Sequence, residues 1–106
     1  MSQPLEGVKV LELGNFIAGP FCGMLLGDMG AAVIKIERPT RGDQTRAMPP
    51  MVNGESASFA ALNRNKRSLV LDLKLQAARD MVLPRGRRPT ISRPATCRCA
   101  SVINTA

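Results

Sequence analysis

The sequence has no histidine, no tryptophan and no tyrosine, and aromatic residues make up only 3% of it. Without histidine the chain lacks both the commonest general base and the commonest metal ligand. Its three cysteines, Cys22, Cys97 and Cys99, are an odd number, which argues against a secreted disulfide scaffold. Cys97 and Cys99 have no second pair of ligands, so no metal site is predicted. Cys22 lies in an apolar, glycine-rich segment and is interpreted as a packed thiol rather than a nucleophile.

The chain also lacks a long apolar run, because none approaches the roughly 20 residues that a membrane helix needs. Residues 1–5 lack the positive charge that begins a signal peptide. With 44% hydrophobic and 22% charged residues in a length of 106, the composition is that of one small soluble domain. We therefore predict a cytoplasmic protein with no membrane partner.

Acidic residues are missing from the last part of the chain. All eight precede residue 84, whereas residues 84–106 contain five arginines and three prolines and show no sustained periodicity. The net charge of +7 therefore comes mostly from this segment. We predict a folded region over residues 1–83 and a non-native or disordered basic tail over residues 84–106. An RNA-binding tail is the alternative interpretation of that segment, although no nucleic-acid partner is predicted for the protein.

The first 40 residues contain two short apolar runs with a helical pattern between them. Residues 8–13 (VKVLEL) end at Gly14, as buried strands do, and residues 32–38 (AVIKIER) form the second run. Between them, Pro20 suits a first helical turn and Gly30 is placed to end the helix. Strand, helix and strand in this order predict a βαβ unit with a right-handed crossover. The predicted fold class is α/β, a Rossmann-like fragment with a parallel sheet.

The pattern after residue 38 is less regular. Residues 39–55 are rich in proline, glycine and polar residues, and they predict a functional or mobile loop. Three elements are expected after it: a short helix over residues 56–62 capped by Ser56 or Ser58, a strand over residues 68–73 after the basic residues 63–67, and a helix over residues 74–83.

Four glycines near the first helix have two open explanations. Gly14, Gly19, Gly23 and Gly27 are spaced 5, 4 and 4 residues apart, so the last three share one helical face. They permit either close packing of the helix on the sheet or close approach of a ligand. The N-terminus of a helix that follows a parallel strand also suits an anion.

The acid at the end of the second strand raises a rival interpretation. Glu37 stands where a dinucleotide-binding fold places its ribose-binding acid, so a nicotinamide-binding module is possible. The glycines do not match G-x-G-x-x-G, because Gly14 is followed by Asn15, Phe16 and Ile17.

Basic residues gather at the predicted strand ends and loops, where a parallel sheet presents its ligand crevice. Arginine binds phosphate through two parallel N–H bonds and lysine acts as a point charge, so a phosphate-rich ligand such as CoA would suit them. In contrast, the acids Asp28, Asp43 and Asp72 have no identifiable acid–base partner. The basic residues are Arg38, Arg41, Arg46, Arg64, Lys66, Arg67 and Lys74.

An ordered set of motifs runs through residues 4–83. It comprises PLEGVKVLEL (4–13), AGP (18–20), LGDMGA (26–31), VIKIERP (33–39), Gly42-Asp43-x-x-Arg46 and NRNKRSL-x-LDLK (63–74). In this order the motifs closely resemble the opening of family III CoA-transferases, the CaiB/BaiF family, which includes formyl-CoA transferase and α-methylacyl-CoA racemase.

The resemblance implies an enzyme that moves CoA between an acyl-CoA and a carboxylic acid, with no permanently bound cofactor and no metal. It also implies an interlocked homodimer, which is in doubt here because that arrangement depends on chain beyond this sequence. The catalytic aspartate of the family lies downstream of residue 106. We therefore predict no catalytic residue here and expect an inactive N-terminal fragment. The implied CoA-binding residues are Ile17, Ala18, Arg38, Leu71, Asp72, Leu73 and Lys74.

Two other functions remain open. An α-methylacyl-CoA racemase-like enzyme would use a His/Asp acid–base pair, and this sequence has no histidine. A non-catalytic nucleotide- or CoA-binding fragment is the alternative from a different class.

The sequence departs from the family pattern after residue 83. The family continues the last helix and reaches an acid-Asn-Phe-x-Pro-Gly motif, which is missing here. We hypothesise that residues from Pro84 onward are an out-of-frame translation. Translating the other two reading frames tests this, and the hypothesis fails if neither frame restores the motif.

Overall fold

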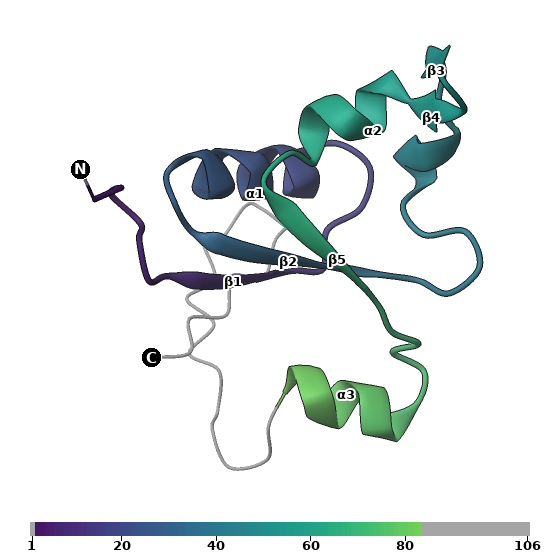
Figure 1. The fold of residues 1–106 in the computed structure, drawn as a ribbon. Helices are drawn as coiled ribbons and strands as arrows, with labels where there is room; N and C mark the ends of the chain where they lie inside the picture. The colour runs from purple at the N-terminus through teal and green to yellow at the C-terminus, as the bar shows by residue number, and fades with distance from the viewer. Residues whose placement is uncertain (1, 84–106) are drawn as a thin grey trace.

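The structure is a computed structural model, and it describes residues 2–83. A three-stranded parallel sheet forms the centre of the molecule. Its strands are β1 (Lys9–Glu12), β2 (Ala32–Glu37) and β5 (Lys66–Val70), which lie in the order β1-β2-β5 (Figure 1). Helix α1 (Ala18–Asp28) joins β1 to β2. The predicted α/β class, with a parallel βαβ unit, is therefore confirmed.

The end of α1 follows from a glycine. Gly30 has φ 101°, a conformation that glycine adopts without steric cost. Its N–H donates to the Gly27 carbonyl at 3.0 Å, and the Ala31 N–H donates to the Leu26 carbonyl at 3.1 Å. These two bonds satisfy carbonyls at the end of the helix, so Gly30 ends α1 as predicted.

The connection from β2 to β5 contains more structure than the predicted loop. It holds the 3-10 helix η1 (Gln44–Ala47), the hairpin strands β3 (Met51–Val52) and β4 (Glu55–Ser56), and helix α2 (Ala57–Leu62). The Ser56 hydroxyl accepts the Phe59 N–H at 3.2 Å, which identifies Ser56 as the cap of α2.

The third strand is the element whose bounds were predicted wrongly. It covers Lys66–Val70 instead of residues 68–73, because Lys66 and Arg67 pair with Val33 and Ile34 of β2. After Val70 the chain turns, and the Asp72 carboxylate accepts the Lys74 N–H at 3.0 Å. Such a local side-chain bond favours a turn over a strand. The last helix, α3 (Gln76–Val82), is slightly shorter than the predicted range of residues 74–83.

Helices lie on both sides of the sheet (Figure 1). Helices α1 and α2 contact each other on one face, and α3 lies on the opposite side (Figure 1). At the amino ends of the strands, on the α1 face, the buried core consists of Val10, Ala31 and Val33. Gly27 of α1 faces this core, where a Cβ would make an ordinary contact of 3.6 Å with Val33 and a slightly tight one of 3.3 Å with Asn65.

Two further predictions concern the tail and the absence of a membrane-spanning helix. The tail predicted for residues 84–106 lies outside the described residues. Within residues 2–83, no helix is both long and apolar enough to cross a bilayer.

Candidate functional site

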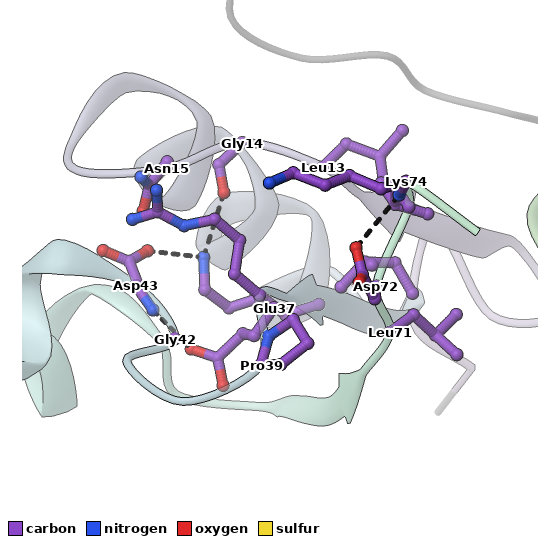
Figure 2. A pocket seen from close by; sticks show the side chains of 14 residues that line it. Leu13, Gly14, Asn15, Glu37, Pro39, Gly42, Asp43, Leu71, Asp72 and Lys74 are labelled. Atoms are coloured by element: carbon purple, nitrogen blue, oxygen red, sulfur yellow. Dashed lines mark hydrogen bonds and ion pairs between the residues drawn. The ribbon is translucent and has the colours of Figure 1, made fainter. Parts of the chain in front are cut away.

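A cavity of about 610 Å³ lies at the carboxyl ends of the three parallel strands. Residues 13–15 after β1, residues 35–39 at the end of β2, Gly42 with Asp43, and residues 71–74 after β5 line it. Figure 2 shows Asp43 and Gly14 on one side of it and Leu71, Asp72 and Lys74 on the other. Ligands of open parallel sheets bind in this crevice, so the cavity is the candidate site.

Two exposed cations border the cavity. Arg38 follows β2 and Lys74 follows β5, and both side chains are exposed. Among residues 2–83, neither side chain forms an ion pair. Leu13, Leu71 and Leu73 supply apolar surface beside them. The lining therefore suits a ligand that carries anionic groups and an apolar part.

The floor of the cavity holds a buried network of opposite charges. Lys35 on β2 and Glu12 on β1 are register partners, so their side chains share the α1 face of the sheet. The Lys35 Nζ lies 2.8 Å from Glu12 Oε1 and 2.7 Å from Asp43 Oδ2, and it donates to the Gly14 carbonyl at 3.2 Å. All three charged side chains are at most 2% exposed. Lys35 therefore connects Gly14, in the segment after β1, and Asp43, at the start of η1, to the sheet.

Asp43 begins η1 and is fixed through both carboxylate oxygens. Oδ1 accepts the Thr45 N–H at 2.9 Å and the Thr45 hydroxyl at 2.8 Å, and Oδ2 faces Lys35. Burial opposes ionisation of Asp43, but the bonds from Lys35 and Thr45 outweigh it, so the pKa of Asp43 is lowered. The group is therefore held as a carboxylate.

Lys66 completes the charge balance of the network. Its Nζ lies 2.7 Å from Glu12 Oε2 and donates to the Pro20 carbonyl at 2.7 Å and to Asn63 Oδ1 at 2.9 Å. Burial lowers the pKa of Lys66, and Glu12 opposes that shift. Glu12 and Asp43 thus face Lys35 and Lys66, two charges of each sign. Gly23 makes room for this arrangement, because a Cβ there would collide with Glu12 Oε2.

Glu37 is occupied by partners within the fold. Arg46 Nε and Nη2 donate to its two oxygens at 2.9 and 2.8 Å, and the Ser68 hydroxyl donates at 2.6 Å. Burial opposes its ionisation, but the bonds from Arg46 and Ser68 prevail and the pKa of Glu37 is lowered. Arg46 also stacks 3.9 Å above the Phe59 ring. Glu37 is therefore engaged in fastening η1, which speaks against the ribose-binding role of the rival interpretation.

The structure brings together only part of the predicted site. Five of the seven implied ligand residues line the cavity, whereas Ile17 and Ala18 are exposed at the start of α1 outside the lining. The predicted set of basic residues divides in the same way. Arg38 and Lys74 line the cavity, while Arg46, Arg64 and Lys66 are paired with Glu37, Asp28 and Glu12.

Two of the three acids for which the sequence showed no partner form ion pairs in the structure. Asp43 is paired with Lys35, and Asp28 with Arg64 at 2.6 Å. Sequence reasoning also missed Glu12 and Lys35 as site residues. Their signal was a charge of each sign inside apolar strands, which a buried parallel sheet accommodates only in pairs.

Other chemistry has little support among residues 2–83. No group of three or more histidine, cysteine or acidic side chains there could hold a metal ion. Cys22 is a half-buried free thiol in α1, apart from the cavity lining. Of the carboxylates that line the cavity, Asp72 is the one without an ion pair in this part of the chain.

Comparison with known proteins gives one consistent result. The profile of the family described as CoA-transferase family III matches residues 5–84. Succinyl-CoA:glutarate CoA-transferase of Mus musculus is 55% identical over 73 residues, which are 68% of this chain and 17% of that protein. Succinyl-CoA--D-citramalate CoA-transferase of Chloroflexus aurantiacus is 46% identical over 81 residues, 76% of this chain and 20% of that protein.

A solved structure shows the same arrangement. The CAIB/BAIF family protein from Brucella suis matches with a TM-score of 0.69 and 44% identity, over 77% of this chain and 23% of that chain. The chain thus spans about a fifth of the length of these relatives.

Proposed function

The chain belongs to CoA-transferase family III, and from this membership we propose that its cavity is part of a site for the CoA group of an acyl-CoA. The proposed reaction of the whole enzyme is transfer of CoA between an acyl-CoA and a carboxylic acid. The observation that carries the proposal is the pair of exposed cations, Arg38 and Lys74, beside apolar leucines at the carboxyl edge of the sheet.

The chemistry of CoA suits this lining. CoA combines phosphate groups with an adenine ring and a long pantetheine arm, which has apolar carbon segments and two amide groups. Arg38 can bind a phosphate through two parallel N–H bonds and Lys74 can act as a point charge. Leu71 and Leu73 offer apolar surface in the same lining, and Asp72 offers an acceptor for polar hydrogens. Ile17 and Ala18 are proposed to complete the site at the start of α1.

The carboxylates of the cavity do not support turnover by this part of the enzyme alone. A carboxylate that attacks a thioester must be a free nucleophile. Asp43 and Glu37 are held by cations, and the bonds that lower their pKa also reduce their reactivity. Asp72 has no ion pair among residues 2–83, but its carboxylate accepts the Lys74 N–H in a turn, and the family resemblance implies a catalytic aspartate further along the chain. We therefore propose that the described residues bind CoA and that the catalytic aspartate lies elsewhere in the enzyme.

Calorimetric titration of CoA into the 106-residue chain tests the binding proposal. We expect binding that weakens about tenfold in Arg38→Ala, the range expected when one charge-assisted contact is lost. Arg41→Ala is the matched control, because Arg41 is exposed and does not line the cavity. No binding by the parent chain, or equal loss in both variants, overturns the proposal.

Isotope exchange tests the catalytic part. With succinyl-CoA and labelled glutarate, the substrates named for one relative, we expect no exchange by the 106-residue chain. Exchange that survives repurification would show that the described residues contain the catalytic group. The relatives compared here are named CoA-transferases, which favours transfer over racemisation. We also propose that the whole enzyme is a homodimer and that it is cytoplasmic. Sedimentation tests the first proposal and cell fractionation the second.

A further inference from the structure

The loop over residues 14–17, which connects β1 to α1, has an unusual backbone. Phe16 has φ 73°, in the left-handed region that a bulky residue rarely adopts. Phe16 is 43% exposed, so packing of the ring does not account for this conformation. The Phe16 N–H donates to Asp43 Oδ1 at 3.3 Å. Conformations of this kind persist where surrounding contacts hold them, which here means Asp43.

Each of the three residues that begin this loop is hydrogen-bonded to a residue of β2 or of the start of η1. The Gly14 carbonyl accepts from Lys35, the Asn15 side chain accepts the Gln44 N–H at 3.3 Å, and the Phe16 N–H donates to Asp43. Lys35 belongs to the sheet, while Asp43 and Gln44 form the start of η1. The loop is therefore clamped between β2 and η1.

The clamp is itself rigid. Lys35 is held by Glu12, and Asp43 by Thr45, which is 0% exposed. Lys35 and Asp43 neutralise each other within the cavity floor, so neither offers a free charge to a ligand. Their contribution to the site must come through the segments that they hold.

We propose that Lys35 and Asp43 are positioning residues, whose buried ion pair sets the loop over residues 14–17 in the conformation that receives CoA. This inference rests on the proposed function for the identity of the ligand, but the control of the loop is testable without any ligand. The ordinary alternative is that the pair only stabilises the fold. The two differ in whether folded molecules without the pair still bind CoA normally.

A charge-matched double variant separates these alternatives. Lys35→Met/Asp43→Ala removes one charge of each sign and every acceptor that Asp43 offers to Phe16 and Thr45. Lys35→Met/Asp43→Asn removes the same charges and keeps an acceptor. Asp28→Ala/Arg64→Ala is the control, an exposed ion pair that does not line the cavity. All three variants keep the net charge, so long-range attraction of CoA is unchanged.

The readouts are the CoA dissociation constant, corrected for the folded fraction from urea titration, and the exchange rate of the Phe16 amide without ligand. We expect the Ala double variant to bind CoA about tenfold more weakly and to exchange faster at Phe16, with partial recovery in the Asn variant. The control pair should change neither value. A corrected dissociation constant equal to that of the parent in both cavity variants overturns the inference.

Two further measurements keep the inference decidable. Where the double variants do not fold, Thr45→Val removes the hydroxyl bond to Asp43 while every charged and every cavity-lining residue keeps its identity. A smaller loss of CoA affinity with faster Phe16 exchange supports the clamp, and unchanged values overturn it. Where the parent chain does not bind CoA, the proposed function fails, and Phe16 exchange alone decides the role of the pair. Equal exchange in the parent and the variants then overturns it.

Discussion

The two ends of the sheet are built differently on the face that α1 covers. At the amino end, Val10 and Val33 pair across β1 and β2 and form the apolar core. Two residues further along each strand, the next pair on this face is Glu12 and Lys35. The same helix, α1, covers both pairs, through Gly27 at one end and Gly23 at the other. The change from apolar to ionic burial takes place where the cavity begins.

The two ends of the sheet therefore contribute differently: the apolar end to the stability of the fold, and the ionic end to the geometry of the cavity. Burial of apolar groups stabilises a fold with little demand on direction. Burial of an ion pair contributes little net stability, because desolvation offsets the attraction, but it demands defined geometry. The amino end therefore accounts for much of the stability of the sheet. The carboxyl end fixes the positions of residues 14–17 and of η1 around the cavity.

Removal of one buried charge should have the largest effect. Lys35→Met keeps most of the length of the side chain but leaves Asp43 without its cation and Glu12 with Lys66 alone. We expect the free energy of unfolding to fall by about 3–5 kcal/mol, as for other broken buried pairs. Urea denaturation followed by circular dichroism measures it.

The same substitution at an exposed position of the sheet is the control. Lys9 lies on β1 and its side chain is exposed. Lys9→Met should change stability by no more than about 0.5 kcal/mol. Similar losses in the two variants would mean that burial does not distinguish the lysines.

The sequence predicted the apolar end of the molecule better than the ionic end. The apolar runs around Val10 and Val33 predicted two strands, and Gly30 predicted the end of the helix between them. All three predictions were confirmed. The third strand was shifted because Leu71 and Leu73 continue its apolar pattern, whereas the turn at Asp72 ends it.

The residues of the site were harder to predict from short stretches of sequence. The resemblance to the family supplied Arg38 and residues 71–74, which do line the cavity, whereas the placement of basic residues at predicted strand ends supplied only Arg38 and Lys74 among them. Lys35 in a strand is typical of an exposed position. Only the register that places it opposite Glu12, together with a bond across eight residues to Asp43, reveals the buried pair.

Substitution of the glycines of α1 should give the next largest difference in the free energy of unfolding between the two ends of the sheet. An alanine at position 23 would collide with Glu12 Oε2 and lie 3.3 Å from Lys66, so the ion pair must move. We expect Gly23→Ala to lower the free energy of unfolding by about 1–2 kcal/mol, after a gain in helix propensity of up to about 1 kcal/mol. At position 27 the contacts are only slightly tight, so Gly27→Ala should be nearly neutral. A reversed order in urea denaturation would contradict this account of the helix.

Acid should weaken the buried ionic network at the carboxyl end more than the apolar core at the amino end. The pKa values of Asp43 and Glu37 are lowered in the folded state, so both carboxylates add stability above their unfolded pKa and lose it as the pH falls through the folded value. The free energy of unfolding should therefore decline from about pH 5 downward. Asp43→Asn should be less stable at neutral pH and decline less steeply. Val33→Ala, at the apolar end, should run parallel to the parent chain, and parallel curves for all three would contradict the assignment.

The exposed ion pair at the amino end should give the smallest effect. Arg64 donates to both oxygens of Asp28, at 3.1 and 2.6 Å, and this contact lowers the pKa of Asp28. The geometry resembles that of Arg46 on Glu37, but the Arg64 and Asp28 side chains are 56% and 30% exposed. Water and salt screen such a pair, so Arg64→Ala should change stability only within the scatter of surface substitutions. The difference from the parent should vanish in about 1 M NaCl, where the screening length is about 3 Å. If Arg64→Ala instead matched Lys35→Met in urea denaturation, the contrast between the ends of the sheet would depend on ion-pair geometry and not on burial.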